Sequence, residues 1–138
     1  MDASVWVPLA SPDHVHHART RQYWDFESAE RAAFCRVTGL AFLRHLTNPR
    51  VMGHAVSNSQ ESWEEYERWL AHPAVIVLGE PRGLHEQFRE FAANLTLGQA
   101  SWTDAYLAAF AIAGGYRLVT VDSGFRRYSG LDLVHLEV

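Results

Sequence analysis

Two aspartates flank one predicted helix–strand unit, and their type and spacing are suited to metal chemistry. Asp104 falls in the first turn of an amphipathic helix predicted over residues 101–113, and Asp122 directly follows a strand predicted over residues 116–121. In a layered α/β domain, a crossover helix begins at the edge where the parallel strands end. The sequence therefore predicts that both carboxylates lie at the same edge of the sheet.

A third carboxylate, Asp2, stands almost at the amino terminus. It joins the other two if the first residues form the end of a parallel strand. Three carboxylates at one edge repel each other unless a hard cation neutralises them, and Mg²⁺ or Mn²⁺ prefers such oxygen ligands together with retained waters. The chemistry that this arrangement suggests is metal-assisted hydrolysis of a phosphodiester bond.

Each acid also has an ordinary structural interpretation, and both alternatives remain open at this point. Asp104 lies three residues after Ser101, close to a capping-box pattern, and an acid in the first turn is favoured by the helix dipole alone. The Asp122–Gly124 segment suits a turn after a strand. The position of Asp2, taken by itself, does not indicate a function.

Composition is typical of one globular domain over residues 1–138, with 48% apolar residues. No apolar run is long enough to cross a membrane and no signal peptide is evident, so we expect a cytoplasmic protein. The formal charge of -4 argues against a protein that coats nucleic acid by bulk electrostatics. All twelve basic residues are arginine, and the single cysteine, Cys35, is expected to be a buried apolar side chain.

Strands and helices are predicted to alternate along the chain. The first half of the chain is predicted to contain an apolar segment that Pro8 interrupts or restricts to a short helix, a helix from Ser11 to about Phe26, a strand over 33–37 and a helix from Thr38 to the Asn48–Pro49 stop. A helix over 60–71, capped by Asn58 or Ser59, and a buried parallel strand over 74–78 follow. The remaining predicted elements are a helical face over 84–95, a loop over 94–100 and an edge strand over 131–138. This order implies an α/β domain with a mostly parallel sheet.

Four segments of the chain carry a family resemblance: "DASVWVPL", "VTGLAFLRHLTNPRV", "TDAYLAAFA" and "LVTVDSGFRRY". Over essentially its full length, the chain resembles a PIN-domain ribonuclease toxin of the VapC type. The resemblance implies a three-layer α/β/α sandwich with a central, mostly parallel sheet, Mg²⁺- or Mn²⁺-dependent endoribonuclease activity, a homodimer and a VapB-like antitoxin. It also implies that Asp2, Asp104 and Asp122 are the metal-site acids and that Thr120 is the accompanying hydroxyl.

Two positions depart from the family pattern. Ala41 stands where many PIN domains carry a glutamate, three residues after Thr38. Family members usually have several apolar residues before the first aspartate, where they form the central strand, whereas here only Met1 precedes Asp2. We therefore expect that the natural protein starts further upstream.

Several arginine, histidine and aromatic side chains outside the acidic motif are further candidates for binding. Arg44, Arg50, Arg126 and Arg127 could contact RNA phosphates or an acidic antitoxin segment, or could be plain surface residues. The cluster of His14, His16 and His17 is expected to be solvated rather than a transition-metal site. Trp102 and Tyr106 are expected to be core or interface residues rather than base-stacking platforms.

Three functions follow from these observations. The first is a metal-dependent endoribonuclease in which the three aspartates hold the ion directly or through water. The alternative is a PIN-like module that binds antitoxin or RNA but has lost efficient cleavage along with the acid at Ala41. The third, a phosphatase of the haloacid-dehalogenase type, is disfavoured because Ser4 occupies the second acidic position of its Asp-x-Asp motif.

Overall fold

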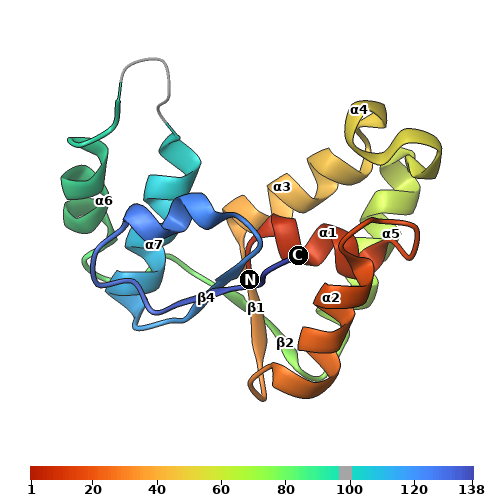
Figure 1. Ribbon diagram of the computed structural model, residues 1–138, viewed down its shortest axis with the longest axis horizontal. Helices are drawn as coiled ribbons and strands as arrows, with labels where there is room; N and C mark the ends of the chain where they lie inside the picture. The colour runs from red at the N-terminus through yellow and green to blue at the C-terminus, as the bar shows by residue number, and fades with distance from the viewer. Residues whose placement is uncertain (97–100) are drawn as a thin grey trace.

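The fold was analysed in a computed structural model that describes residues 1–96 and 101–138. Its four strands form two parallel pairs: β1 (Ala32–Cys35) with β2 (Val75–Leu78), and β3 (Leu118–Thr120) with β4 (Leu133–His135). Helices pack on both sides of this strand layer (Figure 1). The predicted α/β/α sandwich with parallel strands is confirmed, and within the described residues the strand layer consists of these two separate pairs.

The helices divide into two groups that lie on opposite sides in Figure 1. One group comprises α1 (Ala3–Ala10), α2 (His17–Gln22), the π-helical turn η1 (Tyr23–Glu27), α3 (Arg36–Leu46), α4 (Pro49–Met52), the 3₁₀ turn η2 (Gly53–Ala55) and α5 (Ser59–Leu70). The other comprises α6 (Leu84–Ala92) and α7 (Trp102–Gly114), and the 3₁₀ turn η3 (Ser123–Arg127) follows β3.

Each group of helices encloses its own hydrophobic core. The first core is rich in aromatic rings and includes Trp6, which is fully buried and stacks on Phe34 with ring centroids 4.0 Å apart. The second is built from the small residues of α7, among them Ala105 and Ala108, against Leu84 of α6. These alanines let α7, with the acid in its first turn, pack closely against α6.

The two residues before α1 lie between the two strand pairs. The amino group of Met1 donates to the carbonyl oxygen of Ala33 in β1 at 3.2 Å, and the N–H of Asp2 donates to the carbonyl oxygen of Val119 in β3 at 2.9 Å. The helix α1 begins immediately after this dipeptide, and Pro8 lies inside it. The apolar segment is thus the short helix that Pro8 permits, and only Met1 and Asp2 extend the strand layer.

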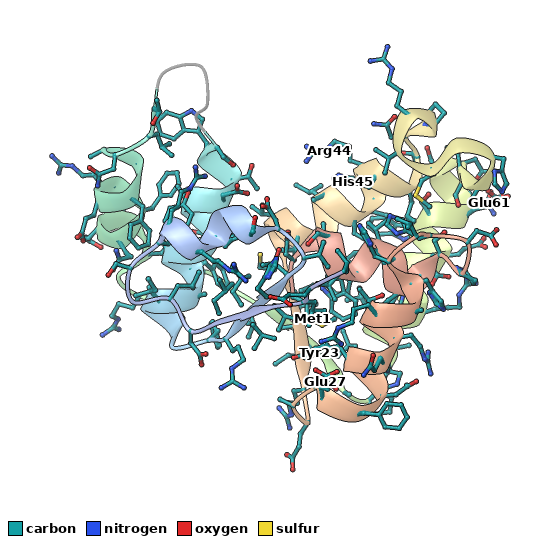
Figure 2. All side chains as sticks on the ribbon, in the orientation of Figure 1. Met1, Tyr23, Glu27, Arg44, His45 and Glu61 are labelled. Atoms are coloured by element: carbon teal, nitrogen blue, oxygen red, sulfur yellow. The ribbon has the colours of Figure 1, made fainter. Side chains whose placement is uncertain are left out.

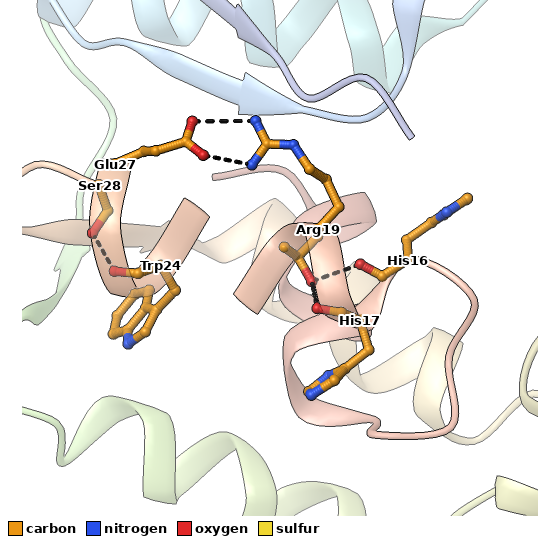
Figure 3. Close-up of polar contacts among 7 residues, drawn as sticks. His16, His17, Arg19, Trp24, Glu27 and Ser28 are labelled. Carbon is orange, nitrogen blue, oxygen red and sulfur yellow. Dashed lines mark hydrogen bonds and ion pairs between the residues drawn. The ribbon is translucent and has the colours of Figure 1, made fainter. Parts of the chain in front are cut away.

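The helix predicted from Ser11 to Phe26 was wrong at its start. Ser11 does not begin a helix, because its N–H donates to the carbonyl oxygen of Pro8 and so closes α1. The helix α2 begins six residues later and passes into η1. The Thr20 hydroxyl donates to the carbonyl oxygens of His16 and His17. Arg19 pairs with Glu27 (Figure 3), with a shortest nitrogen–oxygen distance of 2.8 Å.

The predicted boundary between the first strand and the next helix was two residues late. The strand β1 ends at Cys35, and α3 begins at Arg36 rather than at Thr38. Thr38 belongs to the first turn, where its hydroxyl accepts from the N–H of Cys35 at 2.9 Å and donates to its carbonyl oxygen at 3.1 Å. This threonine caps the helix from within, which is why its position was taken for the helix start.

The strand predicted over residues 74–78 forms, but its burial was overestimated. In β2 the side chain of Val77 is 53% exposed, and only Val75 is buried. The cause is that β2 pairs with β1 alone and lies at the outer edge of its pair. A continuous apolar run therefore did not indicate a strand buried on both faces here.

Several predicted boundaries are confirmed. Asn58 caps α5 and forms a capping box with Glu61, and Gly115 ends α7 in the left-handed conformation with φ 68°. Residues 93–96 follow α6 as predicted for the loop over 94–100, whose last four residues lie outside the described part of the chain. Within the described residues, no helix combines the length and apolarity that a membrane crossing requires.

Replacing Gly39 by alanine is expected to lower the free energy of unfolding. A Cβ atom at this position of α3 would lie 2.6 Å from the hydroxyl oxygen of Tyr66, whose ring is buried against Phe34 and Phe42. Because that ring has no room to retreat, the clash should outweigh the better helix propensity of alanine and leave a net loss of about 1–2 kcal/mol. Urea unfolding measures this loss in the free energy of unfolding. Gly79→Ala, whose Cβ would contact nothing within 4 Å, is the matched control and should stay near wild type.

Candidate acidic site

The carboxylate of Asp2 is held by three donors at the end of the strand layer. Asp2 is the N-cap of α1, and its Oδ1 accepts from the N–H of Ala3 at 2.7 Å. Its Oδ2 accepts from the hydroxyls of Ser4 at 2.8 Å and Thr120 at 3.0 Å. Since Thr120 is fully buried at the end of β3, this hydroxyl ties the amino terminus to the strand that leads to Asp122.

Ser4 is a residue of this site that the sequence analysis did not identify. Besides donating to Asp2, its Oγ accepts from the N–H of Val121 at 3.2 Å and lies 3.1 Å from Oγ1 of Thr120. Thr120 Oγ1 in turn accepts from the N–H of Asp122 at 3.0 Å. The two hydroxyls use their single protons on Asp2 and their lone pairs on backbone N–H groups, so they fix both ends of the site. The sequence pattern that could have identified Ser4 is a hydroxyl residue two positions after an aspartate that caps a helix.

The carboxylate of Asp104 lies in the first turn of α7, where the Ser101 hydroxyl accepts from its backbone N–H at 3.3 Å. Burial raises the pKa of Asp104, and the negative charges of Asp122 and Asp2 raise it further; the contact with Ser101 and the charge of Arg127 act in the opposite direction. The three acids are therefore near enough to repel one another. That Asp2, Asp104 and Asp122 together form a metal site stays a prediction.

Asp122 serves as the turn residue that the ordinary interpretation anticipated. It is the N-cap of η3, and its Oδ1 accepts from the N–H of Gly124 at 2.7 Å. Its side chain is exposed, unlike that of Asp104. The turn interpretation of Asp122 is thus correct locally, whereas at Asp104 the Ser101 hydroxyl caps α7 without a capping box.

The donor set is of the type that a hard divalent cation accepts, but the carboxylates do not close into one ligand cluster. Among the described residues, no group of three or more His, Cys, Asp or Glu side chains meets the spacing of a metal site. Asp2 and Asp122 each keep lone pairs free beyond the hydrogen bonds given above. This geometry fits an ion that contacts one or two carboxylates and reaches the others through its own waters, as Mg²⁺ commonly does.

The helix α3 contributes no carboxylate to this site. Ala41, at the position of the expected glutamate, is buried. Thr38 uses its hydroxyl on Cys35, which is buried and free, as expected. The acidic site therefore consists of the amino-terminal aspartate and the two that flank the α7–β3 unit.

The four candidate arginines differ in their surroundings. Arg127 lies beside the site, with a guanidinium nitrogen 3.6 Å from Oδ2 of Asp104. Arg126 points instead to Nδ1 of His135 at 3.0 Å and to Glu137 at 3.7 Å. Arg44 and Arg50 are exposed, and Figure 2 shows Arg44 projecting from α3 on the side that faces α7. Only Arg127 contacts an acid of the site.

The remaining candidates have structural roles. His17 Nδ1 lies 2.7 Å from the carbonyl oxygen of Pro8, and His14 Nδ1 accepts from the N–H of His16 at 3.1 Å. Tyr106 donates to Glu80 at 2.9 Å and packs edge-on against Phe88, which places it in the α6–α7 contact. Trp102 is 58% exposed, so it is not a core residue, and its expected role at an interface stays a prediction.

Comparisons with known proteins agree on the family. The PIN domain family matches residues 1–131. Ribonuclease VapC41 of Mycobacterium tuberculosis strain H37Rv is 40% identical over 137 residues, covering 96% of this chain and 94% of that protein, and ribonuclease VapC38 of the same strain is 32% identical over 126 residues, covering 90% and 84%. The crystal structure of M. tuberculosis VapC20, a sarcin–ricin loop cleaving toxin, superposes with a TM-score of 0.69 at 16% identity, covering 95% of each chain.

Proposed function

Since the chain belongs to the PIN-domain family and is of the VapC type, we propose that it is a metal-dependent endoribonuclease, the toxin of a toxin–antitoxin pair. The observation that carries the proposal is the 3.0 Å hydrogen bond from Thr120 to Asp2, which joins the amino-terminal aspartate to the strand that leads to Asp122. The charges of Asp122 and Asp2 both raise the pKa of Asp104. Carboxylates that repel one another at the end of a parallel strand layer favour a bound cation. The relatives named as ribonucleases support RNA as the substrate.

In this proposal Asp2, Asp104 and Asp122 hold Mg²⁺ or Mn²⁺, directly or through water. When bound, the ion supplies an activated water and neutralises charge that develops on the phosphate. Ser4 and Thr120 orient the Asp2 carboxylate. Their hydroxyls also accept from the N–H groups of Val121 and Asp122, which holds that carboxylate next to the end of β3. Asp104, whose pKa is raised by burial and by the two neighbouring acids, is stabilised by a nearby positive charge.

Arg127 has two roles in the proposed cycle. Without metal or RNA, its guanidinium partly neutralises Asp104 at 3.6 Å. With an ion in place, the same guanidinium is released to contact an RNA phosphate, for which its forked donors are suited. We also propose Arg44, Arg50 and Arg126 as contacts for the RNA or for an acidic antitoxin segment. The protein is proposed to act in the cytoplasm, as a homodimer with a VapB-like antitoxin.

The proposal is tested with purified protein and a uniformly labelled RNA. Cleavage is expected with Mg²⁺ or Mn²⁺, none with EDTA, and restoration when the ion is added back. Asp13→Asn is the matched control for substitutions of the site aspartates, because this exposed aspartate lies outside the site beside His54. RNA that binds with unchanged affinity but is not cleaved with either ion would favour the alternative, a module weakened by the loss of the acid at Ala41.

Replacing Ser4 by alanine is expected to weaken ion binding by roughly ten- to a hundredfold, because the Asp2 carboxylate loses one of its orienting hydrogen bonds. Isothermal titration with Mn²⁺ measures this loss. Ser4→Thr, which keeps the hydroxyl, should retain most of the affinity. An equal loss in both variants with unchanged thermal stability would show that the hydroxyl does not position Asp2.

A further inference from the structure

The peptide group that joins Val121 to Asp122 is held by a side chain at each end. Its carbonyl oxygen, on Val121, lies 3.1 Å from Nε2 of His135. Its N–H, on Asp122, donates to Oγ1 of Thr120 at 3.0 Å. Because a peptide group is planar, contacts at both its oxygen and its N–H fix the plane in which the chain leaves β3. The backbone that carries Asp122 is therefore held from two neighbouring strands.

The two contacts of the His135 ring define which of its nitrogens carries the hydrogen. Nδ1 of His135 lies 3.0 Å from a guanidinium nitrogen of Arg126, and Nε2 faces the Val121 carbonyl oxygen. A guanidinium can only donate and a carbonyl oxygen can only accept. Nδ1 must therefore accept and Nε2 must donate. The neutral imidazole with its hydrogen on Nε2 is the form that satisfies both partners.

The pairing of β3 with β4 sets the position of this ring. His135 is the last residue of β4 and lies opposite Thr120, the last residue of β3. The next residue, Leu136, is fully buried, and its N–H donates to the carbonyl oxygen of Thr120 at 2.8 Å. The backbone is thus anchored directly after His135. This anchoring leaves the ring to reach past the end of β3.

The same ring contacts the turn that Asp122 begins. Asp122 is the N-cap of η3, and its Oδ1 accepts from the N–H of Gly124 at 2.7 Å. Since the Asp122 side chain is exposed, packing does not hold its carboxylate, which instead moves with η3. Arg126 lies near the other end of η3. His135 therefore restrains η3 at its start, through the peptide before Asp122, and near its end, through Arg126.

From these contacts we propose that His135, in its neutral Nε2–H form, is a positioning residue of the acidic site that sets the direction of the Asp122 carboxylate. It acts through the Val121 carbonyl and Arg126, and does not touch the ion. Ser4 and Thr120 do the same for Asp2, so each exposed or partly exposed acid is oriented by a neighbouring side chain. This inference rests on the proposed function, because it takes Asp122 as an ion ligand.

Replacing His135 by glutamine or asparagine separates its two contacts. The glutamine amide nitrogen reaches the place of Nε2 and can donate to Val121, whereas the asparagine amide oxygen reaches the place of Nδ1 and can accept from Arg126. His135→Gln should therefore bind Mn²⁺ with nearly wild-type affinity. His135→Asn and His135→Phe should bind it roughly tenfold more weakly. Isothermal titration measures the affinities, and the melting temperatures of the same samples show whether each variant folds.

His85→Phe is the matched control, because His85 is an exposed histidine of α6, and its Mn²⁺ affinity should equal that of the wild type. Wild-type affinity in all three His135 variants would overturn this inference alone. An equal loss in the glutamine and phenylalanine variants, at unchanged melting temperature, would also overturn it. If the wild type bound no Mn²⁺, the proposed ion site would fail and this inference would fail with it.

The state of the ring is also tested in the wild type, without metal or RNA. Heteronuclear NMR of the isotope-labelled protein distinguishes a ring nitrogen that carries a hydrogen from one that does not, and His135→Gln identifies the His135 signals by removing them. We expect the hydrogen on Nε2, and a shift of the Nδ1 signal in Arg126→Ala. A hydrogen on Nδ1 of the neutral ring would overturn the proposal, whatever the outcome of the cleavage assays.

Discussion

Asp104→Asn is expected to reduce RNA cleavage by about a hundredfold or more, because it removes a partly desolvated carboxylate of the proposed ion site. The fold should survive, since the helix cap depends on the backbone N–H of Asp104 and the hydroxyl of Ser101, which the substitution leaves in place. Cleavage assays with saturating Mn²⁺ and the melting temperature of the same samples measure both effects. Cleavage at the wild-type rate would remove Asp104 from the site.

The same variant should be more stable than the wild type when no metal is present. Burial and the neighbouring acids raise the folded-state pKa of Asp104, so its contribution to stability is present below its unfolded pKa and is lost as the pH rises through the folded value. At neutral pH the wild type carries a destabilising carboxylate that asparagine lacks. The difference in melting temperature should therefore grow between pH 4 and 7 in EDTA, and Mn²⁺ should reverse it by stabilising only the wild type. A difference that does not change with pH would contradict the electrostatic origin.

Trp6→Ala is expected to cost about 3–5 kcal/mol of the free energy of unfolding. Trp6 is fully buried, stacks on Phe34 and meets Trp69 and Trp24 with ring centroids 5.3 and 5.9 Å apart. The variant removes the central ring of this core and loosens α1, which carries Asp2 as its N-cap and Ser4 in its first turn. Urea unfolding monitored by far-UV circular dichroism gives the loss.

Trp6→Phe is the matched variant and should cost less than half as much. Among the described residues the indole N–H of Trp6 has no hydrogen-bond partner, so phenylalanine removes a buried unsatisfied donor while keeping an aromatic ring. If both variants lost equal stability, the shape of the indole rather than the ring stacking would be the dominant contribution. If Trp6→Ala cost below about 1 kcal/mol, the core around α1 would be less tightly packed than these contacts indicate.

The sequence by itself determined the local structure around the acids and the topology that brings two of them together. Ser101 before the α7 pattern, Gly115 after it and the apolar run into Thr120 specified a helix followed by a parallel strand, because capping and periodicity act over a few neighbouring residues. Right-handed crossover then placed Asp104 and Asp122 at one edge. The family motifs added Asp2 and Thr120.

Only the tertiary structure decided how Asp2 is held, what Ser4 does and which arginine reaches the site. Those contacts join residues more than a hundred positions apart, such as Asp2 with Thr120, and no local pattern encodes their distances. The same limit explains why Val77 is exposed and why Ser11 ends one helix instead of starting another: the outcome depended on which edge β2 occupies and on where α1 closes.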